Sequence, residues 1–134
     1  MSRSVTRAQI GTDHEGLLII GKSVFINEGV IIHAVKSIEI GDFTKIGDNS
    51  TIHDSDYHAL DAICEVRVEK VILGKNVWIG RNVVILPGVS IGDNSVVAAG
   101  SIVTRSVPEN AVVAGNPGRV LDRTLNCPEG FVRS

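Results

Sequence analysis

Aromatic residues are scarce in this sequence. Its 134 residues include one Trp, one Tyr and three Phe, too few for a broad globular core built on aromatic side chains. Val and Ile together number 35 against seven Leu, and this excess of β-branched residues favours strands over helices. A narrow interior filled with Ile and Val accounts for both observations.

Cysteine, net charge and long apolar runs are also in short supply. Cys64 and Cys127 do not make a disulfide framework, and we expect two reduced thiols. The net charge of -2 argues against general nucleic-acid binding, which requires a basic surface. No apolar run approaches the ~20 residues of a membrane span, and the N-terminal MSRSVTRAQIG lacks the apolar segment of a signal peptide. We therefore expect a cytoplasmic, single-domain protein without a membrane span.

What the sequence does contain is a six-residue repeat from Leu73 to Pro108, which reads LGKNVW, IGRNVV, ILPGVS, IGDNSV, VAAGSI, VTRSVP. The first position is always a branched aliphatic, and the fifth is always small or β-branched. A helix period of 3.6 cannot produce this spacing, and plain period-2 strands would not place glycine and turn residues so regularly. A hexapeptide repeat is typical of a β-helix. We therefore predict short parallel strands stacked about 4.8 Å apart, with the first-position side chains pointing inward.

The same pattern occurs earlier in the chain. A first block of repeats begins near Ile20 and resumes at Ile40 after two extra residues, so we predict one solenoid of about four coils. Residues without a clear repeat at the N-terminus should cap the solenoid or form an imperfect first turn. The predicted order is a cap at 1–17, first coils at 18–55, a projecting loop and its re-entry at 56–72, last coils at 73–108 and a tail at 109–134. We expect the end of the tail to form a short helix or to lie along a neighbouring subunit.

Three histidines are candidates for chemistry. His58 lies in the predicted loop between Asp56 and Asp61, and a histidine with carboxylate neighbours has what a general base requires. An ordinary exposed loop histidine is the alternative that spacing alone favours. His33 and His53 occupy the same position of their sextets and should stack on adjacent coils about 5 Å apart. There they could contact a polar substrate, bind a metal or simply be outward polar residues.

Trp78, Arg105 and Arg119 are candidates for ligand binding. Trp78 is the only tryptophan and falls at an outward position, where it either packs between subunits or covers an apolar ligand. The two arginines lie toward the C-terminal end and could hold a phosphorylated cofactor. Ordinary surface arginines are the simpler interpretation of the pattern alone.

The stretch VILGKNVWIGRNVVILPGVSIGDNSVVAAGSIVTRSVPENAVVAGNPGRVL resembles the C-terminal half of the hexapeptide-repeat acyltransferases. It is most similar to the galactoside and maltose O-acetyltransferases and to the acetyltransferases of surface-polysaccharide assembly. The resemblance covers about residues 20 to 121 and includes the sextets, the NVWIG element and the GNPxRV ending. It implies an all-β fold, a left-handed parallel β-helix, and a homotrimer with active sites in the grooves between subunits.

The resemblance also implies roles for individual residues. The family's catalytic histidine precedes the NVWIG element, and the string DYHALD maps that role onto His58, with His53 as the rival base. The residues expected to contact the acceptor are His33, His53, Asp56 and Tyr57. Trp78 should lie against the pantetheine arm of coenzyme A, with the backbone at Gly80 and Arg81 facing the thioester. The remaining coenzyme A contacts implied are Ala99 and Gly100 beside the pantetheine, and Thr104, Arg105 and Arg119 at the adenosine phosphates.

We therefore predict an acetyl-CoA-dependent O-acetyltransferase that acts on a sugar hydroxyl of a saccharide or surface-polysaccharide precursor, by direct transfer with a histidine base. Acetyl-CoA is expected as a co-substrate, with no metal and no permanently bound cofactor. One alternative is N-acetylation of an amino sugar or antibiotic on the same fold. Another is a γ-class carbonic anhydrase-like zinc enzyme that uses His33, His53 and His58. A scaffold that only trimerises is the non-enzymatic alternative, because fold does not fix function.

Overall fold

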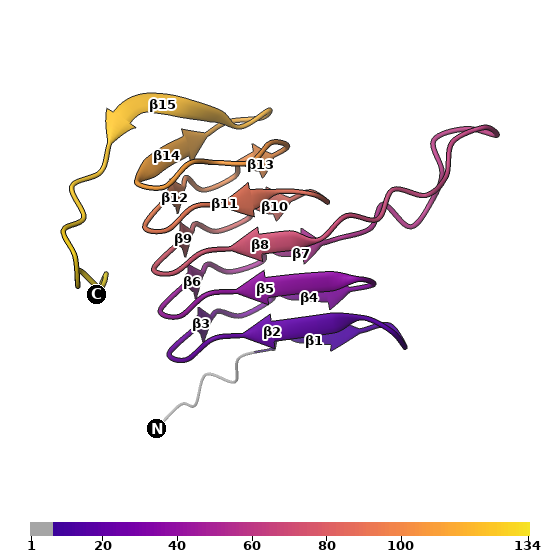
Figure 1. Ribbon diagram of the computed structural model, residues 1–134, viewed down its shortest axis with the longest axis horizontal. Helices are drawn as coiled ribbons and strands as arrows, with labels where there is room; N and C mark the ends of the chain where they lie inside the picture. Colours follow the sequence, from indigo (N-terminus) through magenta and orange to yellow (C-terminus); the bar gives the residue numbers. More distant parts are fainter. Residues whose placement is uncertain (1–6) are drawn as a thin grey trace.

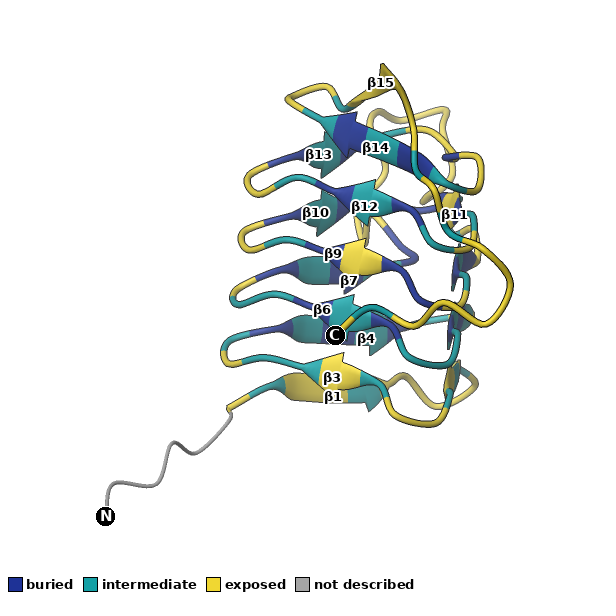
Figure 2. Cartoon of the chain, turned by 90° about the vertical axis from the view of Figure 1, so that its left-hand side faces the viewer, coloured by how far each residue is buried: buried dark blue, intermediate teal, exposed yellow. Residues whose placement is uncertain are grey.

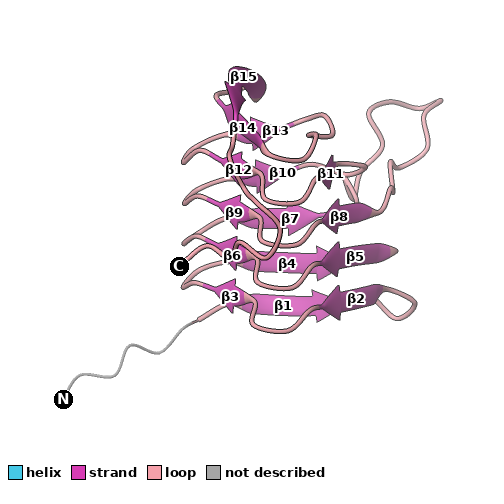
Figure 3. Ribbon diagram, turned by 60° about the vertical axis from the view of Figure 1, so that its left-hand side comes forward, coloured by secondary structure: helices cyan, strands magenta, loops and turns pink. Residues whose placement is uncertain are grey.

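The computed structural model describes residues 7–134, which form a solenoid of short strands with one long loop projecting from it (Figure 1). The strands are β1 (Gln9–Thr12), β2 (Leu17–Ile20), β3 (Phe25–Ile26), β4 (Ile31–Ala34), β5 (Ser37–Ile40), β6 (Lys45–Ile46), β7 (Thr51–His53), β8 (Val71–Leu73), β9 (Trp78–Ile79), β10 (Val84–Ile85), β11 (Ser90–Ile91), β12 (Val96–Val97), β13 (Ile102–Val103), β14 (Ala111–Ala114) and β15 (Arg119–Thr124). Strands and loops account for all of residues 7–134, so this range contains no helix that could cross a membrane (Figure 3).

The strands form three sheets, because each coil gives one strand to each face of the solenoid. The sheets have the orders β1-β4-β7-β10-β13, β11-β8-β5-β2 and β15-β14-β12-β9-β6-β3. All pairings within them are parallel except that of β14 with β15. The all-β solenoid predicted from the repeat is thus confirmed.

The first coil begins earlier than the sequence predicted. β1 pairs with β4 in regular register, from Gln9 opposite Ile31 to Thr12 opposite Ala34. The solenoid therefore has five coils, as its five-stranded sheet shows, rather than about four. Of the two expectations for residues 1–17, an irregular cap or an imperfect first turn, the structure has a first turn from Gln9 onward, because strand pairing does not require the sextet pattern. Residues 1–6 lie outside the described range.

The core is a stack of aliphatic side chains. In the six sextets from Leu73 to Pro108 the first-position residues are all buried, with at most 2% of their surface exposed, namely Leu73, Ile79, Ile85, Ile91, Val97 and Val103. Figure 2 shows buried positions recurring in every coil above the first. Several fifth positions carry buried hydroxyls that join adjacent coils. Ser50 Oγ, for example, donates to Gly80 O at 2.8 Å and accepts from Val83 N at 3.1 Å, so this polar atom is satisfied in the core.

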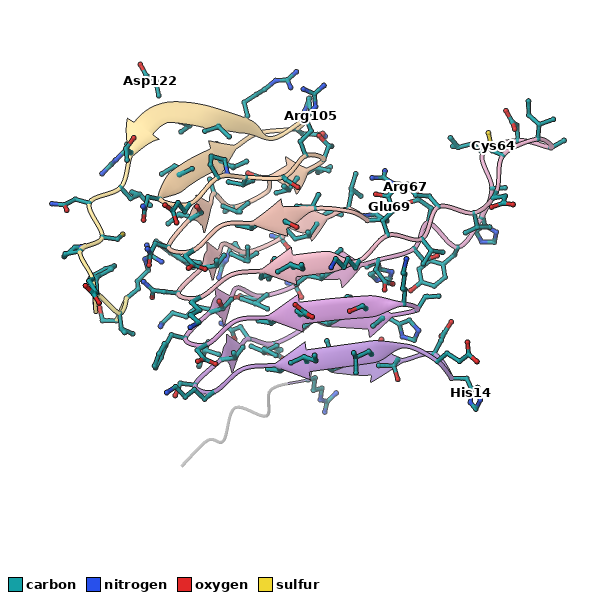
Figure 4. The ribbon with its side chains drawn as sticks, viewed as in Figure 1. His14, Cys64, Arg67, Glu69, Arg105 and Asp122 are labelled. Atoms are coloured by element: carbon teal, nitrogen blue, oxygen red, sulfur yellow. The ribbon has the colours of Figure 1, made fainter. Side chains whose placement is uncertain are left out.

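The projecting loop leaves the solenoid after β7 and returns before β8 (Figure 1). Its two arms are joined at the base by the bonds Asp56 N to Arg67 O at 3.0 Å and Glu69 N to Asp54 O at 2.9 Å. The Asp54 carboxylate is fully buried and accepts three backbone N–H groups from the turn between β4 and β5. The base of the loop is thereby tied to the coil below it. Toward the tip, around Cys64, the loop stands well away from the solenoid (Figure 4).

The C-terminal tail is not the short helix expected as one possibility. β15 runs antiparallel along β14, and the residues after it descend along the turns of the chain's own solenoid (Figure 3). There the Arg133 guanidinium donates to the backbone oxygens of Asn76 at 2.6 Å and Asn94 at 3.0 Å. Lys45 Nζ donates to Arg133 O at 2.7 Å. These bonds hold Arg133 against the coils of β6, β9 and β12.

Candidate active site

A histidine cluster lies at the end of the sheet formed by β4 and β7. His33 and His53 are register partners on these two strands, so the predicted stacking on adjacent coils is confirmed. His33 Nε2 lies 2.6 Å from Asp13 Oδ1, and a carboxylate at this distance fixes the orientation of the imidazole ring. Asp13 could not be predicted from the repeat, because it belongs to the N-terminal stretch that lacks the repeat.

His53 is the more enclosed of the two stacked histidines. Its Nε2 is buried and has no hydrogen-bond partner within residues 7–134. The Tyr57 ring packs edge-on against it, with the ring centroids 5.3 Å apart. Burial lowers the pKa of His53, the charge of His33 lowers it further, and Asp54 opposes both. The imidazole is therefore biased toward its neutral form, the form that a general base requires.

His58 is exposed on the loop, directly beyond its hydrogen-bonded base. In the described part of the chain neither flanking carboxylate bonds to its ring. Asp61 instead accepts the N–H groups of Ile63 and Cys64, each at 3.0 Å. Hydrogen bonds from the Cys64 thiol and from these two N–H groups lower the pKa of Asp61. The carboxylate partners that the sequence offered to His58 thus do not orient it within one chain.

Four of the eight predicted coenzyme A residues come together on the side of the solenoid away from the loop. An open cavity of about 560 Å³ lies over β3, β6, β9 and β12, and Trp78, Gly80, Arg81 and Ala99 all line it. Small residues form its floor. A Cβ placed on Gly80 would lie 2.8 Å from Ala99 N, so the close stacking of these coils excludes a side chain there.

The cavity also contains residues that the sequence analysis missed. Phe25, Asn27, Lys45 and Asp48 extend it toward the N-terminal coils. Phe25 and Lys45 are sixth-position residues like Trp78, and the three share one column of paired strands. Aligning the sextets by position would have identified both.

Arg81 has a free donor at the cavity wall. Its guanidinium pairs with Asp48 at 3.0 Å, and its backbone oxygen accepts the Gly100 N–H at 2.9 Å. Its own backbone N–H has no acceptor among the described residues. The bonds on either side hold the peptide in place and leave this N–H able to bind an oxygen of a ligand.

Arg105 and Arg119 meet elsewhere. Together with Gly118 they line a smaller hollow of about 190 Å³ beside β13 and β14. Both side chains are exposed, and neither is ion-paired within the range that the structure describes. Thr104, which follows β13, and Gly100 line neither hollow. The arrangement offers two cationic groups to an anionic ligand.

The loop and the large cavity lie on opposite sides of the chain. The loop projects from the side of β7 and β8, whereas β6, β9 and β12 form the other side in both views (Figures 1 and 3). His58 and the cavity of the same chain therefore do not face each other. Across residues 7–134 no three side chains of His, Cys, Asp or Glu are grouped so as to hold a metal ion.

Comparison with known proteins shows which sequences this chain is similar to. Residues 70–105 match the family model described as bacterial transferase hexapeptide (six repeats). The chain is 43% identical over 110 residues to the galactoside O-acetyltransferase of Escherichia coli, covering 80% of this chain and 54% of that protein. More generally, it spans little more than half the length of the first relatives that it matches.

Solved structures give a longer match. A hexapeptide-repeat acetyltransferase of Vibrio cholerae, crystallised with acetyl coenzyme A, superposes with a TM-score of 0.78 at 34% identity, over 90% of this chain and 69% of that one. A maltose O-acetyltransferase of Clostridium difficile gives a TM-score of 0.76 at 36% identity, over 90% and 70% of the two chains.

Proposed function

The chain belongs to the hexapeptide-repeat acetyltransferases, and we propose that it transfers the acetyl group of acetyl-CoA to a hydroxyl group of a sugar. One observation carries the proposal. Trp78, Gly80, Arg81 and Ala99, assigned to coenzyme A from their sequence motifs, line a single cavity. A solved relative that superposes over 90% of the chain is complexed with acetyl coenzyme A.

In the proposed complex, acetyl-CoA lies along the solenoid with its phosphates toward the C-terminal coils and its thioester toward the N-terminal coils. The pantetheine arm lies against the Trp78 indole and over the small residues of the cavity floor, which leave room beside the backbone. The adenosine phosphates reach Arg105 and Arg119, where charge-assisted hydrogen bonds favour an anionic group. The thioester then lies near Arg81, on the N-terminal side of Ala99 within the cavity.

Direct transfer needs one base and one oxyanion donor. His58 takes the proton of the acceptor hydroxyl as its oxygen attacks the thioester carbonyl. The Arg81 N–H binds the carbonyl oxygen as it becomes negatively charged. The C–S bond then breaks, and the coenzyme A thiolate receives the proton from the imidazolium. A general base of this kind contributes about 10²–10⁴-fold in rate, and an oxyanion donor about 10²–10³-fold.

The geometry supports a site made by two copies of the chain. Because His58 and the cavity lie on opposite sides of one protomer, the loop of one copy meets the cavity of the next in a closed ring. We propose a homotrimer, in which the His33, His53, Asp56 and Tyr57 region at the loop base borders the acceptor. The acceptor occupies the space between this region and the thioester.

The test is His58→Ala in a thiol-release assay with acetyl-CoA and a panel of galactosides and maltose. We expect kcat to fall by about 10²–10⁴-fold, while the KM for acetyl-CoA changes by less than about threefold. His14→Ala is the matched control, because His14 is also exposed on a turn (Figure 4) and has no proposed role. If His58→Ala keeps kcat within about tenfold of wild type, the base is misassigned and His53→Asn becomes the variant to measure.

A further inference from the structure

The backbone turns sharply at the residue before His58. Tyr57 has a positive φ of 62°, which is uncommon for a residue with a bulky side chain. The other non-glycine residues with positive φ in residues 7–134 all lie in the repeating turns between strands, namely Ser23, Phe43, Asn49, Asn76, Asn82, Asn94 and Asn110. Tyr57 is the exception, because it lies at the base of the projecting loop.

Hydrogen bonding identifies this turn. His58 N donates to Asp56 O at 2.7 Å, a bond between residues i+2 and i around Tyr57. A bond of this span around a positive-φ residue is the pattern of the rarer and more strained form of the γ-turn. Such strain persists only where the surroundings hold the residue in place, and it concentrates at functional sites.

Contacts around Tyr57 keep the residue in this strained conformation. Its ring packs edge-on against His53 at a centroid distance of 5.3 Å and lies 6.2 Å from the ring of His33. Its backbone N–H donates to Ser55 Oγ at 3.0 Å, and Ser55 is itself almost fully buried. The turn is therefore fixed by an aromatic contact on one side and by a hydrogen bond to the base of the loop on the other.

We propose that Tyr57 is a positioning residue, whose ring, held against the stacked histidines, maintains the γ-turn that aims His58 at the acceptor. The role rests on the proposed function, since it acts through the proposed base. It is distinct from the acceptor contact expected from the sequence, because it acts through the edge-on contact of the ring with His53. The phenol oxygen has no part in it, so the aromatic ring alone should suffice.

A double-mutant cycle tests the role with variants that separate the ring from the backbone. Tyr57→Phe keeps the ring and should retain kcat within about twofold. Tyr57→Gly keeps a backbone suited to positive φ but removes the ring, and should lower kcat by about 10- to 100-fold, the range that a small misplacement of a catalytic group costs. The KM values for acetyl-CoA and acceptor should stay within about twofold.

The decisive comparison uses the His58→Ala background. If Tyr57 acts only through His58, Tyr57→Gly should change the residual rate of His58→Ala by less than about twofold, because the two effects are coupled. A full additive loss in that background would show a general structural role and overturn the proposal. A raised acceptor KM for Tyr57→Gly, with kcat retained, would overturn it in favour of direct acceptor contact.

Amide hydrogen exchange gives a readout that does not depend on activity. Exchange over residues 58–66 should be faster in Tyr57→Gly than in wild type, and unchanged in Tyr57→Phe. Equal exchange in all three proteins would overturn the positioning role even if the wild type is active. A wild type that consumes no acetyl-CoA, together with faster exchange in Tyr57→Gly, would instead remove the proposed function and leave Tyr57 as the residue that holds the loop.

Discussion

A site made by two protomers can be tested by mixing variants that are each defective in a different half. His58→Ala removes the proposed base from the loop. Ala99→Leu places a larger side chain in the cavity that accommodates acetyl-CoA. Ala99 is exposed at the cavity wall, so the larger side chain enters the cavity and not the core. Each variant alone should therefore fold normally and have little activity.

The expected recovery follows from counting. In a closed ring each site takes its loop from one protomer and its cavity from the next. If equal amounts of the two variants assemble at random, about a quarter of the sites receive an intact loop and an intact cavity. The mixed protein should then regain about a quarter of the wild-type activity. If each site belonged to one chain, every site would carry one defect and no activity would return.

A second mixture controls for assembly. Wild type mixed with the double variant His58→Ala/Ala99→Leu should fall from about half to about a quarter of wild-type activity once subunits exchange. A site within one chain would leave it at about half. Co-expression with two affinity tags isolates the mixed assemblies, and native mass spectrometry measures their composition. Mixed assemblies that show no recovery in the first mixture, and no loss in the second, would refute the shared site.

Two further predictions concern the base of the loop. Asp54→Asn leaves at least one of three partly buried N–H groups without an acceptor and should lower the free energy of unfolding by about 2 kcal/mol in urea titration. Asp122→Asn, on an exposed carboxylate (Figure 4), should stay within about 0.5 kcal/mol of wild type, and equal effects would contradict the anchoring role. Because the pKa of His53 is lowered in the fold, the unfolded chain binds the extra proton first, so stability should fall as pH drops below about 6.5. The melting temperature of His53→Gln should decrease less than that of wild type as the pH is lowered. An equal decrease in both proteins would rule out His53 as the source of the acid sensitivity.

The positions of the residues in the cavity can be predicted, because equivalent positions of successive sextets pair with one another in the stacked strands. Once the first position points inward, the sixth position of each sextet must lie outward beside the next strand of the same sheet. Trp78 was placed correctly by this reasoning, and the same rule places Lys45 one coil earlier. The stacking of His33 on His53 followed in the same way, from shared position and the spacing of parallel strands.

The first coil was expected only as one of two alternatives, an irregular cap or an imperfect first turn, because its sequence lacks the repeat. β1 pairs regularly with β4, yet its residues do not show the sextet pattern. Within residues 7–134 no coil lies below this one, and its inward-facing Ile10 and Ile20 are 43% and 39% exposed. Core packing therefore constrains the sequence less at this coil than at the coils above it. Asp13, the partner of His33, lies in this stretch and was invisible to an analysis based on periodicity.

The loop marks the limit of that reasoning. A break in the repeat shows where the chain leaves the solenoid, and the string around His58 shows which residue to test, but neither sets the direction of the imidazole. That direction depends on a positive-φ turn at Tyr57, a conformation that local preference disfavours for a bulky side chain. Contacts with His53, and a loop base tied down by Asp54, stabilise the turn, and these residues come together only after the coils have stacked. The positions of the cavity residues can therefore be predicted from the repeat. The orientation of the His58 side chain cannot, because it depends on tertiary contacts that form only once the coils have stacked.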